Sequence, residues 1–431
     1  MVAPLLLKNG RVIDPANGLD GIRDLLLVEG KIAAVTLPGE VDGPAGVETL
    51  DLAGKWVVPG LIDMHVHLRE PGQEHKETIE TGTLAAAAGG FTAVACMPNT
   101  KPVNDNEAVT QLILAKAAAR GSARVYPVGA ISSGSRGEAL AEYGEMKQAG
   151  VVAVTDDGLP VVNSQLMRRA LEYAGNHELL VISHAEEPTL SQNGAMNDGA
   201  LATRLGLRGI PHVAEEIMVY RDLALAQYTG RPIHIAHVST RESVDLIRRA
   251  KAKGVAVTAE TAPHYFTLTE AAVDQYNTRA KMNPPLRRQA DVDAIRQGLR
   301  DGTLDAIATD HAPHSELDKD VEFDLAANGI IGLETAVPLT LRLVREGILE
   351  AGGMIALLSV NPARILGVVG GALSVGAVAD VTVIDPEKEF VYGPEAVHSK
   401  SVNSPFLGWQ FKGKAVLTIL AGRVTYSDFP G

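Results

Sequence analysis

The sequence predicts an α/β fold, a (β/α)₈ barrel of the TIM type that carries a small β-sandwich formed from the N- and C-terminal segments. Between about residues 61 and 310, eight β-rich runs alternate with helical patterns. Eight such units are the number that closes a barrel. Both ends of the chain consist instead of short apolar runs separated by Gly, Pro and Asp, and the length of 431 residues suits one large domain with an addition.

The barrel prediction depends on where the runs and the helical patterns lie. Residues 163–177 form a helical pattern that starts at Asn163 and Ser164, and residues 240–254 form another, with Thr240 as the N-cap and Gly254 as the stop. A last helical pattern covers residues 332–347, after a long loop. The β-rich runs begin at Leu61, Phe91, Ala123, Val151, Leu179, Pro232, Val255 and Leu304.

The two ends of the chain predict strands that pair with each other. The short runs there are broken by turn residues, and they lie at residues 5–18, 24–36 and 48–60 before the barrel and at 380–390 and 413–427 after it. We expect residues 1–56 together with 367–431 to form the small β-sandwich. Residues 57–366 then form the hydrolase barrel.

Charge and composition exclude several classes of partner. The chain has 52 acidic and 39 basic side chains, a formal net charge of −13, which disfavours binding to nucleic acid or to anionic lipid. No apolar stretch is long enough to span a bilayer, and the first residues include Lys8 and Arg11 where a secretory segment needs a longer apolar run. We therefore expect a cytoplasmic protein with no nucleic-acid or membrane partner. The single cysteine, Cys96, lies in an apolar run and receives no chemical role.

The first run contains two histidines that can share a ligand. His65 and His67 are two positions apart, so in a strand their side chains point to the same side. This geometry suits two imidazoles on one metal ion. Alone, the pair is equally compatible with two hydrogen-bonded structural histidines.

Four further runs end in a residue that can bind a metal: Asp157, His184, His237 and Asp310. Enzymes with this barrel place their chemistry at the carboxyl ends of the strands, and packing alone explains a repeated buried Asp or His poorly. Four imidazoles with carboxylates between them suit Zn²⁺, and a bridging Asp could hold two ions. A carboxylate beside the metal can take a proton from water and pass it to a leaving nitrogen. Asp310, on the last strand, is the candidate for that role, so the residues predict a metal-dependent hydrolase.

Eight short motifs then establish a resemblance. In order, spacing and completeness they resemble those of the class I (bacterial) dihydroorotases of the amidohydrolase superfamily, and the likeness extends to NPAR at Asn361 and ADVTVID at Ala379. The motifs are HVHLREPG from His65, MPNT from Met97, DDG from Asp156, SHAEE from Ser183, AHVST from Ala236, ETAPHY from Glu260, MNPPLR from Met282 and ATDHAPH from Ala308.

The resemblance implies a site with two zinc ions per subunit. His65 and His67 would hold one ion, His184 and His237 the other, and Asp157 would bridge them. Asp310 would be both a ligand of the first ion and the catalytic acid/base. The family's reaction is the reversible zinc-dependent cyclisation of N-carbamoyl-L-aspartate to (S)-dihydroorotate plus water in pyrimidine biosynthesis. In the hydrolytic direction, a metal-bound hydroxide attacks the ring amide, and the metal stabilises the oxyanion that develops.

The resemblance also implies residues that bind the substrate. Its unreactive carboxylate needs a cationic clamp, which Arg69 offers as a planar fork, with Asn99 and His314 sharing the task. Arg69 could instead pair with Glu70. The other implied contacts are His67, Asn283, which could equally shape a rigid turn, and Asn328 and Gly329 in a loop that departs from the pattern of many relatives. For His234 and His264 we expect core or supporting roles.

Two alternatives compete with this interpretation. Dihydropyrimidinases, hydantoinases and allantoinases share the barrel, but they bridge the metals with a carboxylated lysine on the fourth strand, and the run VVAVTDDG has no Lys. A non-catalytic partner subunit of aspartate carbamoyltransferase is expected to lose metal ligands, and here all are present. Association with that transferase remains open, and a homodimer is expected from the general frequency of twofold assemblies.

Overall fold

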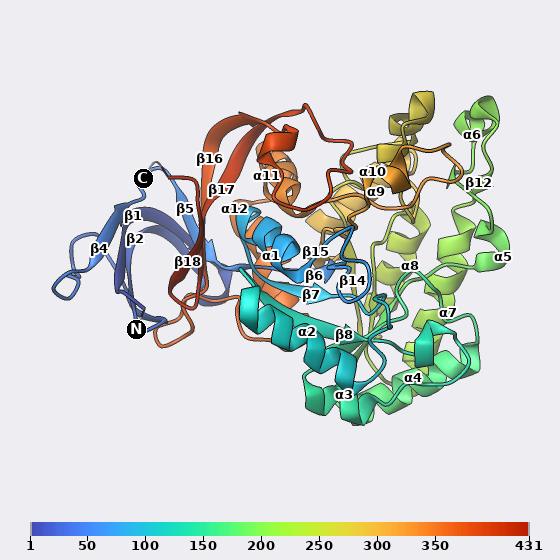
Figure 1. The fold of residues 1–431 in the computed structure, drawn as a ribbon, viewed down its shortest axis with the longest axis horizontal. Coiled ribbons are helices and arrows are strands. Elements are labelled where there is room, and N and C mark those ends of the chain that lie inside the picture. Colours follow the sequence, from blue (N-terminus) through green and yellow to red (C-terminus); the bar gives the residue numbers. More distant parts are fainter. Residues whose placement is uncertain (1, 430–431) are drawn as a thin grey trace.

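Eight parallel strands form a barrel in the computed structural model, which describes residues 2–429. They follow one another around the barrel in sequence order (Figure 1). A parallel bridge between Val66 and His311 joins the first strand to the segment after the last one, so the barrel is nearly closed. The strands are β6 (Leu61–Val66), β7 (Phe91–Cys96), β8 (Arg124–Gly129), β9 (Ala153–Val154), β10 (Leu180–Ser183), β13 (Ile233–Ile235), β14 (Val257–Thr261) and β15 (Ala306–Ile307). The predicted barrel is confirmed.

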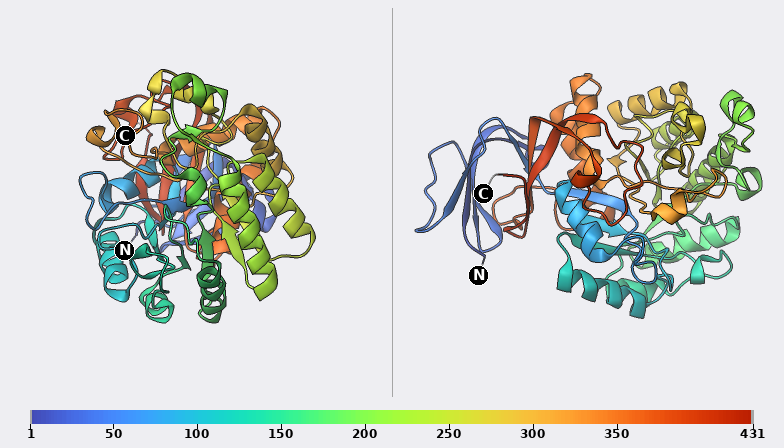
Figure 2. Two further views of the ribbon diagram at one scale, coloured as in Figure 1. Left: turned by 90° about the vertical axis from the view of Figure 1, so that its right-hand side faces the viewer. Right: turned by 45° about the horizontal axis from the view of Figure 1, so that its top comes forward.

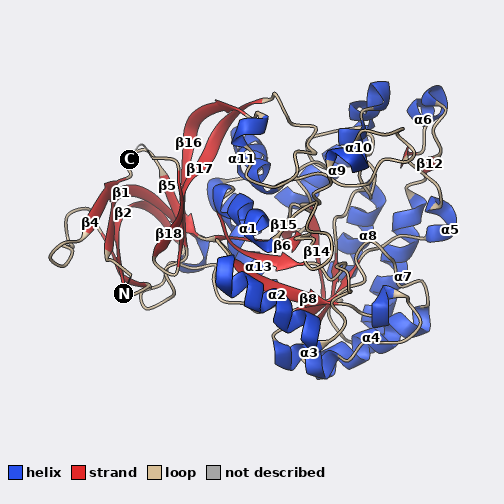
Figure 3. Cartoon of the chain, in the orientation of Figure 1, coloured by secondary structure: helices blue, strands red, loops and turns tan. Residues whose placement is uncertain are grey.

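A helix follows each barrel strand and packs on the outside, as Figure 3 shows. Two helices begin as predicted: the side chain of Asn163 accepts from Gln165 N and Leu166 N, and that of Thr240 accepts from Ser243 N. These contacts satisfy amide groups that have no partner within the helix. The helices are α1 (Ile79–Ala88), α2 (Glu107–Arg120), α3 (Tyr143–Ala149), α4 (Ser164–Asn176), α7 (Val213–Thr229), α8 (Arg241–Ala252), α9 (Gln289–Arg300) and α11 (Ala336–Arg345).

The two ends of the chain pair into one mixed sheet beside the barrel. Its strand order is β18-β17-β16-β5-β1-β2-β3, with β4 against β1, and the sheet curls around a core of its own that includes Leu25, Val57, Val383 and Ile419 (Figures 1 and 2). Pairing of the terminal segments is confirmed. The strands are β1 (Leu5–Asp14), β2 (Leu19–Val28), β3 (Lys31–Thr36), β4 (Glu48–Asp51), β5 (Trp56–Pro59), β16 (Val381–Val391), β17 (Gln410–Leu420) and β18 (Arg423–Ser427).

The junction between sheet and barrel fixes the direction of the barrel strands. β5 ends at Pro59 and β6 begins at Leu61, so the parallel strands start near the sheet and their carboxyl ends lie on the opposite side of the barrel. The amino-terminal end is covered by α12 (Ala351–Ile355), a π-helix (Ala356–Val360) and α13 (Asn361–Leu366). Asn361 Nδ2 donates to Asp305 O at 2.8 Å there. The domain limits at residues 56/57 and 366/367 stay a prediction.

Short elements lie in the loops at the carboxyl end. Between β10 and α7 the chain forms α5 (Pro188–Ser191), β11 (Met196–Asn197), α6 (Ala200–Leu205) and β12 (Gly209–Ile210), and between β15 and α11 it forms α10 (Glu316–Lys319). Short 3₁₀ segments lie at Pro15–Asn17, Ser133–Ser135, Glu270–Tyr276, Thr278–Ala280, Leu333–Thr335 and Pro394–Ala396, and the segment Glu270–Tyr276 is kinked at Asp274 and Gln275. Among the described residues, no helix has the length and apolar character needed to cross a membrane.

Candidate metal centre

The six predicted ligands meet at the carboxyl end of the barrel. His65 lies in β6 and His67 just after it, and the others follow β9, β10, β13 and β15: Asp157, His184, His237 and Asp310. All six side chains are buried. Parallel strands bring their ends to one edge, which explains why residues from five distant parts of the sequence converge.

Asp157 lies at the centre of the cluster. Its Oδ1 atom is 3.2 Å from His65 Nε2, 3.5 Å from His237 Nε2 and 3.6 Å from His184 Nδ1. Its Oδ2 atom is 3.4 Å from His67 Nε2. Two triads have ligand atoms close enough for one ion, His65 with His67 and Asp310, and His65 with Asp157 and His237. This central carboxylate could therefore contact ions on both sides.

Asp310 completes the cluster beside the two histidines of the first strand. Its Oδ1 atom is 3.1 Å from His67 Nε2 and 3.6 Å from His65 Nε2. Within residues 2–429, neither Asp157 nor Asp310 forms an ion pair with a lysine or arginine. Two buried carboxylates without a fixed cation are costly, so the donor set fits a bound metal ion.

In three of the histidines, the ring nitrogen that points away from the cluster lies at hydrogen-bond distance from an acceptor oxygen. His65 Nδ1 lies 2.7 Å from Glu260 Oε1, His67 Nδ1 lies 2.9 Å from Asn99 Oδ1, and His184 Nε2 lies 3.0 Å from Glu186 Oε2. Each acceptor places the ring proton outside and leaves a lone pair facing the cluster. His65 Nε2 is buried and has no hydrogen-bond partner in the described part of the chain. This orphaned atom facing Asp157 is a second sign that the residues fit a metal.

The charges in the cluster depend strongly on one another. Burial alone would raise the pKa of Asp157, yet the imidazoles of His65, His184 and His237 hold it well below its usual range. Burial also raises the pKa of Asp310, but the imidazoles of His65 and His67 outweigh burial and lower this pKa to about 2. Both carboxylates are thus ionised, and their negative charges at the centre of the cluster are what a bound cation would neutralise.

Three residues of the site have an unusual backbone. Arg69, His237 and Asp310 have φ angles of 60°, 35° and 49°, in the left-handed region that side chains other than glycine rarely adopt. Such conformations persist only where surrounding contacts impose them, and they gather at functional sites. The backbone at the strand ends therefore adopts an uncommon conformation that sets the direction of these side chains.

Arg69 and His314 face each other beside the cluster. Arg69 NH2 lies 3.2 Å from His314 Nε2, and Arg69 Nε donates to Pro313 O at 3.2 Å. Glu70, the alternative partner of Arg69, pairs instead with Lys116 and accepts from Ile79 N. The guanidinium is buried without a carboxylate partner among the described side chains, so it is free to take an anionic group.

His314 is held neutral by its surroundings. Burial, Arg69 and Lys76 lower the pKa of its imidazole to about 2. Lys76 Nζ donates to Nδ1 at 3.2 Å, so Nε2 carries the proton and donates to Asn328 O at 2.8 Å. Lys76 was not predicted, because nothing in its sequence neighbourhood links it to a residue that follows it by more than two hundred positions.

The remaining predicted substrate residues lie at the same end of the barrel. Asn99 contacts His67, as described, and Asn283 Nδ2 donates to Glu186 Oε2 at 2.8 Å, which connects it to His184. Gly329 has a φ of 121°, and a Cβ atom there would lie 2.5 Å from Ala312 Cβ. Only glycine fits this close approach, and Gly329 N donates to Lys281 O at 3.0 Å.

Two supporting carboxylates, Glu186 and Glu260, escaped the sequence analysis. Glu260 is the penultimate residue of β14, close to the strand end as the metal ligands are, and that position is visible in the sequence although its contact with His65 is not. Glu186 is two residues from His184 and has no comparable pattern. His234 was expected in a supporting role, and it contacts Thr258 Oγ1 at 2.7 Å and Glu260 Oε2 at 3.3 Å.

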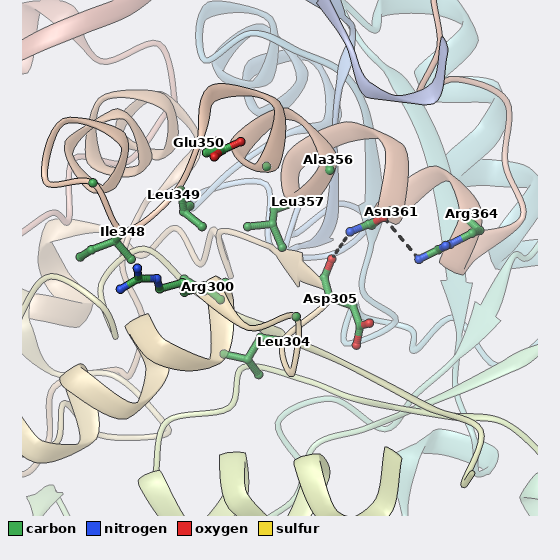
Figure 4. A pocket seen from close by; sticks show the side chains of 14 residues that line it. Arg300, Leu304, Asp305, Ile348, Leu349, Glu350, Ala356, Leu357, Asn361 and Arg364 are labelled. Atoms are coloured by element: carbon green, nitrogen blue, oxygen red, sulfur yellow. Dashed lines mark hydrogen bonds between the residues drawn. The ribbon is translucent and has the colours of Figure 1, made fainter. Parts of the chain in front are cut away.

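A hollow of about 620 Å³ lies away from this cluster (Figure 4). Leu304, Leu349 and Leu357 line it together with Arg300 and Arg364. It adjoins Asp305, before β15, whereas Asp310 follows that strand, so hollow and cluster lie at opposite ends of the barrel. Its lining includes Asp305 and Glu350 but no histidine or cysteine, unlike the donor set at the carboxyl end.

A nearly closed parallel barrel with buried His and Asp at the carboxyl ends of its strands defines a metal-dependent hydrolase of the amidohydrolase superfamily. Comparison with known proteins gives the particular family. The chain is 61% identical over 422 residues to the dihydroorotase of Syntrophotalea carbinolica, with 98% of this chain and 99% of that protein covered. It is 58% identical over 422 residues to the dihydroorotase of Geobacter metallireducens, with the same coverage. The chain belongs to the dihydroorotase family.

Two further comparisons agree with this placement. The dihydro-orotase-like family pattern matches residues 54–243. Among solved structures, the fold is similar to an L-hydantoinase (dihydropyrimidinase) from Arthrobacter aurescens, with a TM-score of 0.88, 25% identity, and coverage of 100% of this chain and 97% of that one. A dihydropyrimidinase from Brevibacillus agri, at 22% identity and a TM-score of 0.84 over 99% of this chain and 95% of that one, shares the fold.

Proposed function

We propose that this chain catalyses the reversible ring closure of N-carbamoyl-L-aspartate to (S)-dihydroorotate and water. The observation that carries the proposal is the buried cluster of four histidines and two aspartates beside a free guanidinium, in a chain of the dihydroorotase family. The cluster supplies metal ligands and a proton acceptor. The guanidinium supplies recognition of a carboxylate, which both substrates carry.

We propose that two zinc ions bind in the cluster. His65 and His67 would hold one, His184 and His237 the other, with Asp157 between them and Asp310 on the side of the first. When bound, zinc acidifies water and polarises the carbonyl that is attacked. Imidazole and carboxylate donors suit this ion better than a hard cation such as Mg²⁺.

Asp310 is the proposed acid/base. Its carboxylate is ionised and lies within 3.1 Å of a ligand histidine, so it can accept a proton from the attacking water and return it to the leaving ring nitrogen. In the direction of ring closure the same group runs these transfers in reverse.

The remaining residues orient the substrate. Arg69 would bind the unreactive carboxylate as a fork, and we propose that His314 and the amide of Asn99 also contact it. His67 would be both a metal ligand and a substrate contact, and Asn283, Asn328 and Gly329 would bind the ring. A substrate without a carboxylate leaves Arg69 buried and unpaired, which disfavours hydantoins and dihydrouracil.

Turnover of the purified, zinc-loaded protein tests the proposal. Dihydroorotate is supplied beside dihydrouracil and allantoin, and loss of the ring's ultraviolet absorbance is followed. Selective hydrolysis of dihydroorotate supports substrate, clamp and reaction together. Turnover of a control compound alone would assign the chain to another activity of the superfamily, and silence of metal-loaded protein would favour a partner-subunit role.

Predictions on assembly and location remain. We expect a homodimer, association with aspartate carbamoyltransferase remains open, and the cytoplasm stays the predicted location. Sedimentation of the protein alone and mixed with that transferase distinguishes monomer, dimer and complex.

A further inference from the structure

A buried carboxylate lies directly behind one of the proposed zinc ligands. Glu260, at the end of β14, has 1% of its surface exposed, and its Oε1 atom lies 2.7 Å from His65 Nδ1. Its other oxygen, Oε2, lies 3.3 Å from His234 Nε2, an ion-pair distance without hydrogen-bond alignment. The carboxylate is therefore placed between a ligand histidine and a second histidine that does not face the cluster.

The strand register places these groups together. Thr258 and Glu260 are two positions apart in β14, so both side chains point into the barrel, and Thr258 is the register partner of His234 in β13. His234 Nδ1 and Thr258 Oγ1 lie 2.7 Å apart. Since β15 separates β14 from β6, Glu260 reaches His65 across the inside of the barrel rather than from a neighbouring strand.

No fixed cation neutralises this carboxylate. In residues 2–429 no lysine or arginine lies within 4.0 Å of it, and its two close neighbours are the imidazoles of His65 and His234. A buried carboxylate without a fixed cation is costly unless its oxygens are hydrogen-bonded. The neighbour in direct hydrogen-bond contact is His65, whose Nε2 faces Asp157.

We propose that Glu260 is a positioning residue for the metal, acting through His65. By accepting the Nδ1 proton, it fixes the ring so that the Nε2 lone pair points at the cluster, and its negative charge makes that nitrogen a stronger donor. His234, held by Thr258, supports the carboxylate from behind. The inference rests on the proposed function, because it takes His65 to be a zinc ligand.

Zinc affinity, measured by competition with a chelator, tests the role apart from turnover. We expect Glu260→Gln to raise the zinc dissociation constant by about 10- to 100-fold, the usual effect of removing the group that holds a ligand histidine. Glu260→Asp keeps the charge but draws the oxygens back from His65, and the same loss of affinity is expected. If the Gln variant does not fold, the Asp variant carries the test alone.

Glu334→Gln is the matched control. Glu334 Oε1 lies 2.7 Å from His398 Nδ1, the same contact in a part of the chain that holds no predicted ligand. Its zinc affinity should equal that of the wild type. Wild-type affinity in the folded Glu260 variants would overturn the inference.

Failure of the inference can be separated from failure of the proposed site by His65→Asn. If this variant binds zinc as tightly as the wild type, His65 is no ligand and the proposed metal site itself is wrong. If His65→Asn binds weakly while both Glu260 variants bind normally, the site stands and only the role of Glu260 is lost.

Discussion

At the scale of single residues, Asp310 carries the proton chemistry. We expect Asp310→Ala to lower kcat by about a thousandfold, within the range that general acid–base catalysis contributes. The fold and most of the bound zinc should remain, since five other ligands are intact. Turnover of dihydroorotate, with zinc per chain measured on the same sample, checks this, and near-normal activity would overturn the assignment.

Arg69 is the residue that should decide the affinity for substrate. Its buried guanidinium has no carboxylate partner among the described residues, so a substrate carboxylate gains a charged hydrogen bond there. Arg69→Met should raise KM for dihydroorotate by about 10- to 100-fold, as a loss of about 1.5–3 kcal/mol implies. Arg124→Met, which removes a partner of Asp380 elsewhere, is the control. Unchanged kinetics in the Arg69 variant would remove it from the clamp.

The pair of His398 and Glu334 makes a prediction about pH. The hydrogen bond that the Glu334 carboxylate accepts from the ring of His398 raises the pKa of His398 above its unfolded value of about 6.5. A raised folded pKa stabilises the fold fully below the unfolded value, and this stabilisation is lost as pH rises through the folded value. Glu334→Gln should therefore cost more stability at about pH 6 than at about pH 9. Urea unfolding at both values measures it, and an equal cost at both would contradict the sign.

Sequence reasoning reached the ligands but not the groups that hold them. Each of the predicted strand-end ligands lies at or just after the carboxyl end of a barrel strand, and that position is visible in the chain itself: His65, Asp157, His184, His237 and Asp310. The contacts of Lys76 with His314 and of Glu260 with His65 depend on which side chains meet across the barrel interior. No spacing in the sequence encodes such a meeting.

At the scale of elements, the strands and the capped helices were predictable because their signals are local. Asn163 and Thr240 cap the helices that they were expected to cap. Local signals do not fix strand length, as β9 shows. The run from Val151 predicts a longer strand than the two residues that pair with the neighbouring strands. Elements such as α10, four residues long, are too short to produce a periodic pattern.

The helix α10 nevertheless anchors the loop that the substrate is expected to meet. Lys319 Nζ donates to Thr278 O and Lys281 O at 3.1 Å and to Ala327 O at 2.6 Å, in a buried position. It joins the segment before Asn283 to the segment with Asn328 and Gly329. Lys319→Met should therefore speed amide exchange at Gly329 and raise KM by about 10-fold, if about 1.4 kcal/mol of loop order is lost.

The exposed Lys101 supplies the control for that variant. Lys101→Met removes the same charge from the surface and should leave amide exchange and KM unchanged. Slow exchange at Gly329 in the Lys319 variant would show that the loop is held by other contacts.

At the scale of the whole molecule, the sequence predicted how many units close the barrel and that the two ends of the chain pair. It could not predict the closing contact between Val66 and His311, because β6 and the segment after β15 carry no shared pattern. The helices that cover the amino-terminal end of the barrel were not predicted either. Asn361 attaches them to Asp305 O through a single side-chain hydrogen bond, and no pattern in the sequence links these two residues.

The metal should stabilise the molecule as a whole, because its proposed ligands come from five strands that are distant in the sequence. A ligand that binds only the folded state adds about 2.7 kcal/mol at a concentration one hundred times its Kd. At about 2–4 °C per kcal/mol, removal of zinc with a chelator should lower Tm by roughly 5–10 °C. Thermal unfolding at a series of free zinc concentrations measures this, and zinc added back should restore Tm. Asp157→Asn, which weakens the central ligand, should show a smaller rise with zinc. A Tm that does not depend on zinc would mean that no ion links these strands.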